Sequence, residues 1–483
     1  MSVGTSIRRG FAWLLFGSLG NRFLQFAFGI ILARLLLPAE FGIIATVSVL
    51  TGLASMVTSG GMGQSIIRAK EVDEKDFCAV FSLQLLICVF WYVVFFILSP
   101  FIAIFFNNPI YTDLIRVSTL SFLLKPHSYM RMAWLNREME FGKRSVVNFI
   151  TALVTGVLSI LMAWYGMGVW SLVLSSLFGS LFNNILAGMI VPIRFKLTTN
   201  KTIMKKHVGF GFKITAIDIL AYLSREGKTL IISKVAGTAF VGLFNKAESQ
   251  AKLPNNLIMP SLMQPVFRAM AKIQDDLDKT KYLLYRSITL LFVMTIPLYV
   301  SLWWVAETFI VTLYGENWRP SVEPIRILVF SGFFFNFLYP FGVLINAQNK
   351  LTQEIIVSIL RLLITIVACL IGLNWGLSGA SIGIVVSYAL AVIMLYSIVN
   401  KTIHTRIADL LKAILPGILL GSILFLILGL VDFSLGDIQN AYPILYLLIM
   451  AIIGALTYVL AFLFVPIQSL NSEVQRVRKI LKL

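Results

Sequence analysis

Uninterrupted apolar stretches of about 20 residues recur along the chain and limit its fold more than any other feature. Backbone groups in lipid have no water to bond, so only helices and closed barrels can cross a bilayer. Continuous rather than alternating apolar runs indicate helices. Only 13% of the 483 residues are charged, against about 25% in an average soluble protein. We therefore expect an all-α integral membrane protein.

The spacing of the runs predicts about fourteen transmembrane helices. The expected spans cover 11–34, 41–59, 78–98, 114–135, 146–164, 169–192, 214–234, 240–265, 286–313, 325–347, 354–373, 376–399, 412–431 and 442–465. The stretch Ile7–Leu37 is too long for a signal-peptide core and lacks a small-residue cleavage site, so we expect it to be the first span. No connection has room for a soluble catalytic domain. We therefore predict no catalytic residues and no enzyme.

The net charge of +18 would suit a nucleic-acid-binding protein, but the cations lie in alternate connections between spans. The connections that carry them include Arg8, Arg9, Arg68, Lys70, Lys75, Arg137, Lys143, Arg144, Arg194, Lys196, Arg268, Lys272, Lys401 and Arg406. The connections between them, such as "NNPIYTD", "YGMG" and "VDFSLGD", hold almost no Lys or Arg. The positive-inside rule then predicts that both termini are cytoplasmic and leaves no role for nucleic acid.

The three cysteines, Cys78, Cys88 and Cys369, lie in or beside apolar runs. Their odd number and the absence of paired Cys/His spacing predict neither disulfides nor a metal site. We expect no cofactor, apart from a proton or sodium gradient as a source of energy.

A shift of 200 residues aligns two halves of the chain. It places "ARLLLPAEFG" (33–42) over "SKVAGTAFVG" (233–242), so that Arg34 meets Lys234 and Gly42 meets Gly242. Further matches pair Gln64, Arg68 and Ala69 with Gln264, Arg268 and Ala269. Six spans per half keep the halves parallel, and parallel repeats bind substrate at their interface. We predict an amino-terminal lobe (1–200), a second six-helix lobe (201–405), and two extra helices with a basic cytoplasmic tail (406–483).

Charges interrupt the expected seventh span, although a charge at the bilayer centre costs roughly 2.5–3.5 kcal/mol or more. Asp218, Tyr222, Arg225 and Thr229 share one helical face. Glu226 and Lys228 lie on its two shoulders. The positions 200 residues earlier, Ser18, Arg22, Gln25 and Gly29, form a second stripe in the same register. Span eight adds a third stripe, whereas span two reads as nearly apolar, so we expect a lopsided cavity.

Cations outnumber acids on these stripes, which predicts a watery chamber with an anionic ligand; the fork of an Arg suits phosphate. The predicted substrate-binding residues are Arg22, Gln25, Lys125, Tyr222, Arg225, Lys228, Asn245, Ser249, Lys252, Asn256 and Arg361. Asp218, Glu226 and Glu248 are candidates to carry a coupling ion. The alternative for each charge is a structural pair, and Lys125, before Pro126, could instead mark a broken helix.

Three segments resemble a known family. The first is "LARLLLPAEFGIIATVSVLTGLASMVTSGGMGQSIIRAKE", and the others are "FRAMAKIQDD" (267–276) and "TLYGENWRPSVEPIRIL" (312–328). They are similar to Wzx-type oligosaccharide flippases of the multidrug/oligosaccharidyl-lipid/polysaccharide superfamily, in the colanic-acid-exporter-like branch. The resemblance implies a transporter of two six-helix lobes and two further helices. Such a transporter works by alternating access. The resemblance also implies a central cationic cavity, here Arg22, Arg225, Lys228 and Lys252 by position.

The implied activity is transfer of undecaprenyl-diphosphate-linked oligosaccharide from the inner to the outer leaflet of the bacterial cytoplasmic membrane, for surface polysaccharide biosynthesis. The implied partners are this glycan, membrane lipids and other glycan-assembly proteins. Two alternatives stay open. A multidrug exporter of the same superfamily would have to move cations through a cation-rich chamber, and a membrane polysaccharide polymerase or ligase would need an acceptor site that the short outward connections do not offer.

Overall fold

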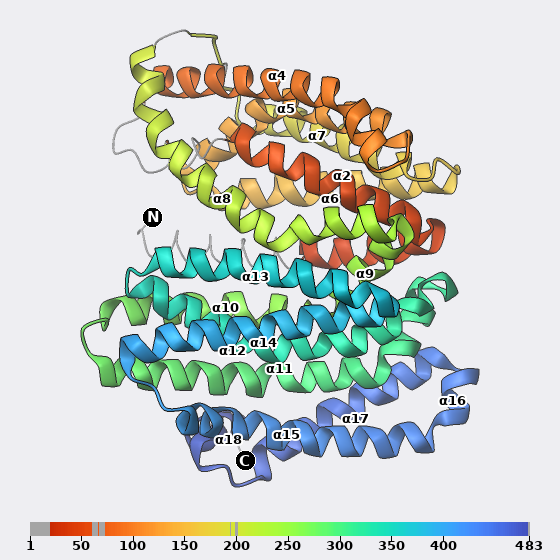
Figure 1. Ribbon diagram of the computed structural model, residues 1–483, viewed down its shortest axis with the longest axis vertical. Coiled ribbons are helices and arrows are strands. Elements are labelled where there is room, and N and C mark those ends of the chain that lie inside the picture. Colours follow the sequence, from red (N-terminus) through yellow and green to blue (C-terminus); the bar gives the residue numbers. More distant parts are fainter. Residues whose placement is uncertain (1–19, 60–65, 67–72, 194, 199–200, 482–483) are drawn as a thin grey trace. The chain divides into compact units, whose positions relative to one another are not determined.

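The computed structural model describes residues 20–59, 66, 73–193, 195–198 and 201–481 (Figure 1). Every long regular element in these ranges is a helix, and none of the described residues lies in a strand. Nine helical stretches of the described chain are long and apolar enough to cross a membrane. The expected all-α membrane protein is confirmed, while the count of fourteen spans stays a prediction. Outside the described ranges lie Arg8, Arg9, Ser18, Gln64, Arg68, Ala69, Lys70 and Arg194.

The chain forms two compact units, 1–242 and 243–483. The helices of the first are 20–35, α2 (Pro38–Ser59), α4 (Glu74–Phe105), α5 (Ile110–Arg137), α6 (Phe141–Trp164), α7 (Trp170–Ile190) and α8 (Lys201–Ala236). Helix α8 packs on α2 and α4 within this unit. The lobes predicted to meet at residue 200 therefore stay a prediction, since these units divide at residue 242.

Helix α9 (Thr238–Ala251) crosses the boundary between the units. The elements that follow are α10 (Leu253–Lys272), α11 (Leu277–Tyr314), η1 (Glu316–Ser321), α12 (Val322–Ala347), α13 (Leu351–Gly372), η2 (Leu373–Trp375), α14 (Gly376–Ile403), α15 (Ile407–Ser434), α16 (Gly436–Ala441), α17 (Pro443–Phe464), η3 (Gln468–Leu470) and α18 (Asn471–Leu481). The expected basic tail thus contains the helix α18.

Proline shapes two of the expected spans differently. Expected span eight consists of α9 and α10, which meet at Lys252, because Pro254 has no N–H to continue the backbone ladder. Helix α5 continues past Pro126 to Arg137, so the alternative that Lys125 marks a broken helix is wrong.

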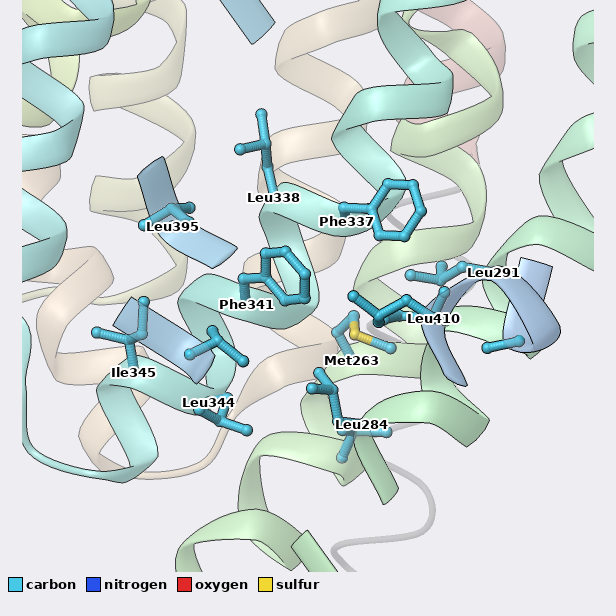
Figure 2. Close-up of a cluster of buried hydrophobic side chains, with 14 of the residues drawn as sticks. Met263, Leu284, Leu291, Phe337, Leu338, Phe341, Leu344, Ile345, Leu395 and Leu410 are labelled. Carbon is cyan, nitrogen blue, oxygen red and sulfur yellow. The ribbon is translucent and has the colours of Figure 1, made fainter. Parts of the chain in front are cut away.

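Each unit has its own apolar core. In the first, Phe95, Tyr111 and Phe122 pack with α2 residues such as Val47. In the second, side chains from α10, α11, α12, α14 and α15 interlock (Figure 2). The labelled examples include Met263, Leu284, Leu291, Phe337, Phe341, Leu395 and Leu410. These cores pack one face of each helix and so fix the positions of the polar residues on the other faces.

The first turns of α2 and α9 touch backbone to backbone through a reciprocal glycine contact in the first unit. A Cβ on Gly42 would lie 1.7 Å from the carbonyl oxygen of Thr238, and a Cβ on Gly242 would lie 1.8 Å from that of Pro38. Pro38 and Thr238 are matched by the same 200-residue shift as Gly42 and Gly242. Two segments related by a two-fold axis would make this pair of contacts.

Candidate functional site

A cavity of about 740 Å³ lies within the first unit, between the helix over 20–35, α2, α5, α6 and α7. From α2 it is lined by Ser48, Thr51 and Ser55, which follow one another at i, i+3 and i+7. This spacing keeps side chains on one face of a helix. The expectation that span two is nearly apolar is therefore wrong, because its hydroxyls form one wall of this cavity.

Three more helices present stripes of the same kind to the cavity. Helix α5 contributes Ser118, Ser121 and Lys125. Helices α6 and α7 contribute hydroxyl and amide groups, among them Thr151, Thr155, Ser159, Ser176, Ser180 and Asn183. The sequence prediction, which followed charges, missed these residues. Their spacing of three and four residues on neighbouring spans was the signal that could have found them.

Lys125 is the one cation among the described lining residues. Its ammonium donates to Ser55 Oγ at 2.6 Å and lies 4.8 Å from the centre of the Phe122 ring. Between α7 and α6, Asn183 Nδ2 donates to Thr151 Oγ1 at 3.0 Å. These bonds join α5 to α2 and α7 to α6, so they hold the walls in place while leaving part of their hydrogen-bonding capacity unused.

Tyr222, a residue of the predicted polar stripe on α8, contacts the α2 wall of the cavity from behind. Its hydroxyl donates to the carbonyl oxygen of Ser48 at 3.1 Å. A Cβ at Gly52 would lie 2.1 Å from the same hydroxyl, so the glycine makes room for the tyrosine. Because Ser48 and Gly52 also line the cavity, Tyr222 places this end of α8 next to it.

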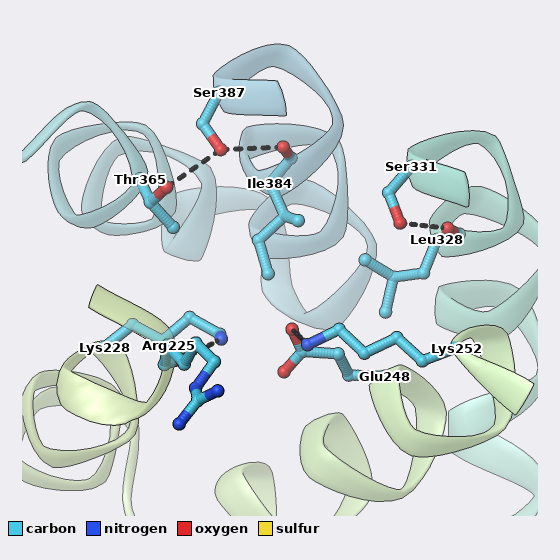
Figure 3. Close-up of polar contacts among 9 residues, drawn as sticks. All are labelled: Arg225, Lys228, Glu248, Lys252, Leu328, Ser331, Thr365, Ile384 and Ser387. Carbon is cyan, nitrogen blue, oxygen red and sulfur yellow. Dashed lines mark hydrogen bonds and ion pairs between the residues drawn. The ribbon is translucent and has the colours of Figure 1, made fainter. Parts of the chain in front are cut away.

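The two predicted cations after Tyr222 differ in their surroundings. Arg225 is exposed. Lys228 is only 6% exposed, and its ammonium donates to the carbonyl oxygen of Arg225 at 2.8 Å (Figure 3). Lys228 is thus turned back along its own helix, and Arg225 is the more accessible cation of the pair.

The other predicted residues of the first unit fall into two groups, those that line the cavity and those that do not. Gln25 lines the cavity together with Lys125. Arg22 and Asp218 are exposed and Glu226 is half-buried, and none of the three is part of the cavity's described lining. The structure therefore brings together Gln25, Lys125 and, through the wall, Tyr222.

In the second unit, Lys252 and Glu248 form an ion pair of 2.7 Å (Figure 3). The pair bridges the junction of α9 and α10, where Lys252 stands between the two helices. Because Glu248 is buried and Lys252 is half-buried, the pair is a structural feature of this junction. Of the other predicted residues of span eight, Asn245 is half-buried and Ser249 and Asn256 are exposed.

Arg361 and Lys246 lie against aromatic rings in the second unit. The Arg361 guanidinium is 5.8 Å from the ring centre of Tyr388 on α14. The Lys246 ammonium is 3.8 Å from the ring of Tyr314 and 5.0 Å from that of Trp318, a packing that the sequence did not reveal. Among the described residues, no group of three or more His, Cys, Asp or Glu side chains could hold a metal ion.

Residues 31–323 match the family model described as "Polysaccharide biosynthesis protein". The chain belongs to this family. The lipopolysaccharide biosynthesis protein WzxC of Escherichia coli (strain K12) is 24% identical to it over 384 residues, which cover 77% of this chain and 76% of WzxC. The succinoglycan biosynthesis transport protein ExoT of Rhizobium meliloti (strain 1021) is 23% identical over 329 residues, covering 68% and 66%. The predicted resemblance to Wzx-type proteins is confirmed.

Solved structures show which fold this family member has. The lipid II flippase MurJ in an inward closed conformation superposes with a TM-score of 0.72 and 16% identity, covering 92% of this chain and 97% of MurJ. An inward-facing multidrug resistance transporter of the MATE family reaches 0.64 at 15% identity, covering 80% and 94%. The polysaccharide biosynthesis family member therefore has the helical fold of membrane transporters, and it is a multi-pass membrane protein.

Proposed function

We propose that the protein is a flippase that moves an oligosaccharide joined to undecaprenyl diphosphate from the inner to the outer leaflet of the bacterial cytoplasmic membrane. The observation that carries this proposal is a large hydroxyl-lined cavity inside a membrane transporter fold, beside a helix with accessible cations. A polyprenyl chain has no polar groups to bond the hydroxyls of this cavity, whereas the hydroxyls of a sugar can bond them. The names of WzxC and ExoT point to the same class of cargo.

In this mechanism the two repeated halves of the chain rock against each other. The motion opens the substrate-binding site to one side of the membrane and then to the other. Arg225 offers its guanidinium to the diphosphate, because a planar fork can bind two phosphate oxygens at once. The polyprenyl chain stays in lipid. Both termini lie in the cytoplasm, as the distribution of Lys and Arg favours.

Coupling to a proton or sodium gradient would use an acidic side chain that can change its occupancy. Glu248 is held by Lys252, which makes it a poor carrier. Asp218 is exposed on α8, so it is the better candidate.

The multidrug exporter is the second candidate, and the MATE-like fold supports it. Its usual cargo is cationic, and both the accessible Arg225 and the cavity's Lys125 would repel such a ligand. A flippase with an anionic substrate fits these two positive charges better.

The test is the sidedness of lipid-linked oligosaccharide in cells with wild-type, deleted and Arg225→Ala protein. Labelling from the outer face should fall on deletion and in Arg225→Ala, at equal protein level. Arg476→Ala, which removes an exposed cation from α18, is the matched control and should behave as wild type. Unchanged sidedness on deletion would refute the flippase, and normal transport by Arg225→Ala would remove only Arg225 from the site.

A further inference from the structure

The cavity of the first unit and the cations of α8 differ in chemistry, and this difference divides the substrate between them. We propose that the cavity binds the sugar residues of the glycan, while the diphosphate stays outside it at Arg225. This inference rests on the proposed function and names which part of the substrate each surface takes.

The lining of the cavity suits a neutral, hydroxyl-rich ligand. Stripes of Ser, Thr, Asn and Gln supply both donors and acceptors, and Lys125 is the one cation among its described residues. A diphosphate carries more than one negative charge, which a single ammonium already bonded to Ser55 would leave uncompensated. The volume of about 740 Å³ falls within the range of about 300–1,000 Å³ for small-molecule sites.

One buried hydroxyl of the wall has no hydrogen-bond partner among the described residues. Ser159 is 3% exposed, and its Oγ has no hydrogen bond to any described residue. Buried hydroxyls are normally bonded to protein or to ordered water, so Ser159 offers a hydrogen bond that a polar molecule in the cavity could take. Close to it in the sequence, Thr155 is accommodated by Gly179 of α7, where a Cβ would lie 2.0 Å from Thr155 Oγ1.

Hydroxyls that bond their own helix are the plainer explanation for some of the lining. Thr51 donates to the carbonyl of Val47, and Ser180 to that of Ser176. Such bonds are common in helices and need no ligand. They use the donor of each hydroxyl, however, and leave its oxygen as an acceptor for the O–H groups of a sugar. The same residues can therefore serve both roles.

The two surfaces meet at Tyr222. Its hydroxyl bonds the backbone of the cavity wall at Ser48, and the exposed Arg225 follows three residues later on the same helix. A glycan whose first sugar lies by Ser48 in the cavity would have its diphosphate towards α8 and Arg225. The geometry thus sets an order along the substrate, with lipid and diphosphate first and sugars last.

The experiment measures two probes on the full-length protein in nanodiscs: cellobiose as a neutral saccharide and farnesyl diphosphate as a polyprenyl diphosphate. The variants are Thr155→Val with Ser159→Ala, and Arg225→Ala. Thr119→Val is the matched control, since Thr119 is a buried α5 hydroxyl that bonds Ile115 and lies outside the described lining. Calorimetry gives the Kd of each probe.

We expect the double variant to raise the Kd for cellobiose about tenfold, the loss of two hydrogen bonds, and to leave that for farnesyl diphosphate unchanged. Arg225→Ala should do the reverse, and the control should change neither. Unchanged binding of farnesyl diphosphate also shows that the double variant is folded. Ser176→Ala, which removes an exposed hydroxyl from the wall, is a milder second variant with an expected rise of about threefold.

The inference is overturned if wild-type protein binds farnesyl diphosphate and not cellobiose, or if both the double variant and Ser176→Ala bind cellobiose as wild type does. In those cases the cavity holds water alone, and the flippase proposal still stands on the sidedness assay. If deletion leaves sidedness unchanged, the flippase falls and this inference falls with it.

Discussion

Ser159 and Ser175 show how one hydrogen bond affects what a buried serine contributes to stability. Both line the cavity, and they are 3% and 2% exposed. Ser175 donates to the carbonyl of Leu172 at 3.2 Å, whereas Ser159 has no partner among the described residues. Leaving a buried hydroxyl unpaired costs about 1–3 kcal/mol. The unpaired hydroxyl of Ser159 should therefore lower the free energy of unfolding relative to an alanine at this position.

We predict that Ser159→Ala raises the midpoint of thermal unfolding of the ligand-free protein, by a free energy of about 1 kcal/mol. Ser175→Ala, the matched control, should leave the midpoint unchanged or lower it. Thermal unfolding in detergent, at equal protein and lipid content, measures both. A lower midpoint for Ser159→Ala would mean that the Ser159 hydroxyl stabilises the protein and contradict this prediction, and a bound water would then be its partner.

At the scale of the element, the helices followed from the sequence far better than the contacts did. The apolar runs predicted spans over 78–98 and 146–164, and the helices α4 and α6 cover them. The turn of Lys228 onto the Arg225 carbonyl was not predictable, because a stripe gives the direction of a side chain and not its partner. The ion pair of Glu248 with Lys252 was open to prediction, since i and i+4 are neighbours on a helix.

The hydroxyl stripes were missed for a physical reason. Ser and Thr can bond their own helix in lipid, so they are tolerated in a span whether or not they line a cavity. Only the agreement of several helices marks a polar chamber, as with Thr151 and Thr155 on α6 beside Ser180 on α7. That agreement depends on which helices are neighbours, and the order of spans along the chain does not state it.

The glycine contact between α2 and α9 gives the prediction for the element scale. Gly42→Ala and Gly242→Ala should each lower the free energy of unfolding by about 1–3 kcal/mol, because the new Cβ would overlap a backbone carbonyl that cannot move alone. The two losses should be similar, as the contacts are reciprocal. Gly29→Ala is the control: its Cβ would meet nothing within 4 Å, so the helix should gain about 0.5–1 kcal/mol. Chemical unfolding of the purified variants measures all three, and a tolerated Gly42→Ala would contradict the contact.

At the scale of the whole molecule, the distribution of charge predicts the orientation in the membrane. We expect green fluorescent protein fused after Leu483 to fluoresce and alkaline phosphatase at the same place to be inactive, because both termini should be cytoplasmic. Fusion after Trp375, in a connection without Lys or Arg, should give the opposite pair of results. Active phosphatase at the carboxyl terminus would reverse the orientation.

The reciprocal glycine contact also bears on how such a chain could arise. In a homodimer of one six-helix half, a two-fold axis would let a single glycine codon supply both contacts. After fusion of two copies, the two positions are separate codons, and a mutation in either one breaks a contact that the other cannot replace. A gene fused in this way would have two sites under purifying selection where its ancestor had one. In return, the two halves are free to diverge elsewhere, so that one can keep hydroxyls where the other acquires charges.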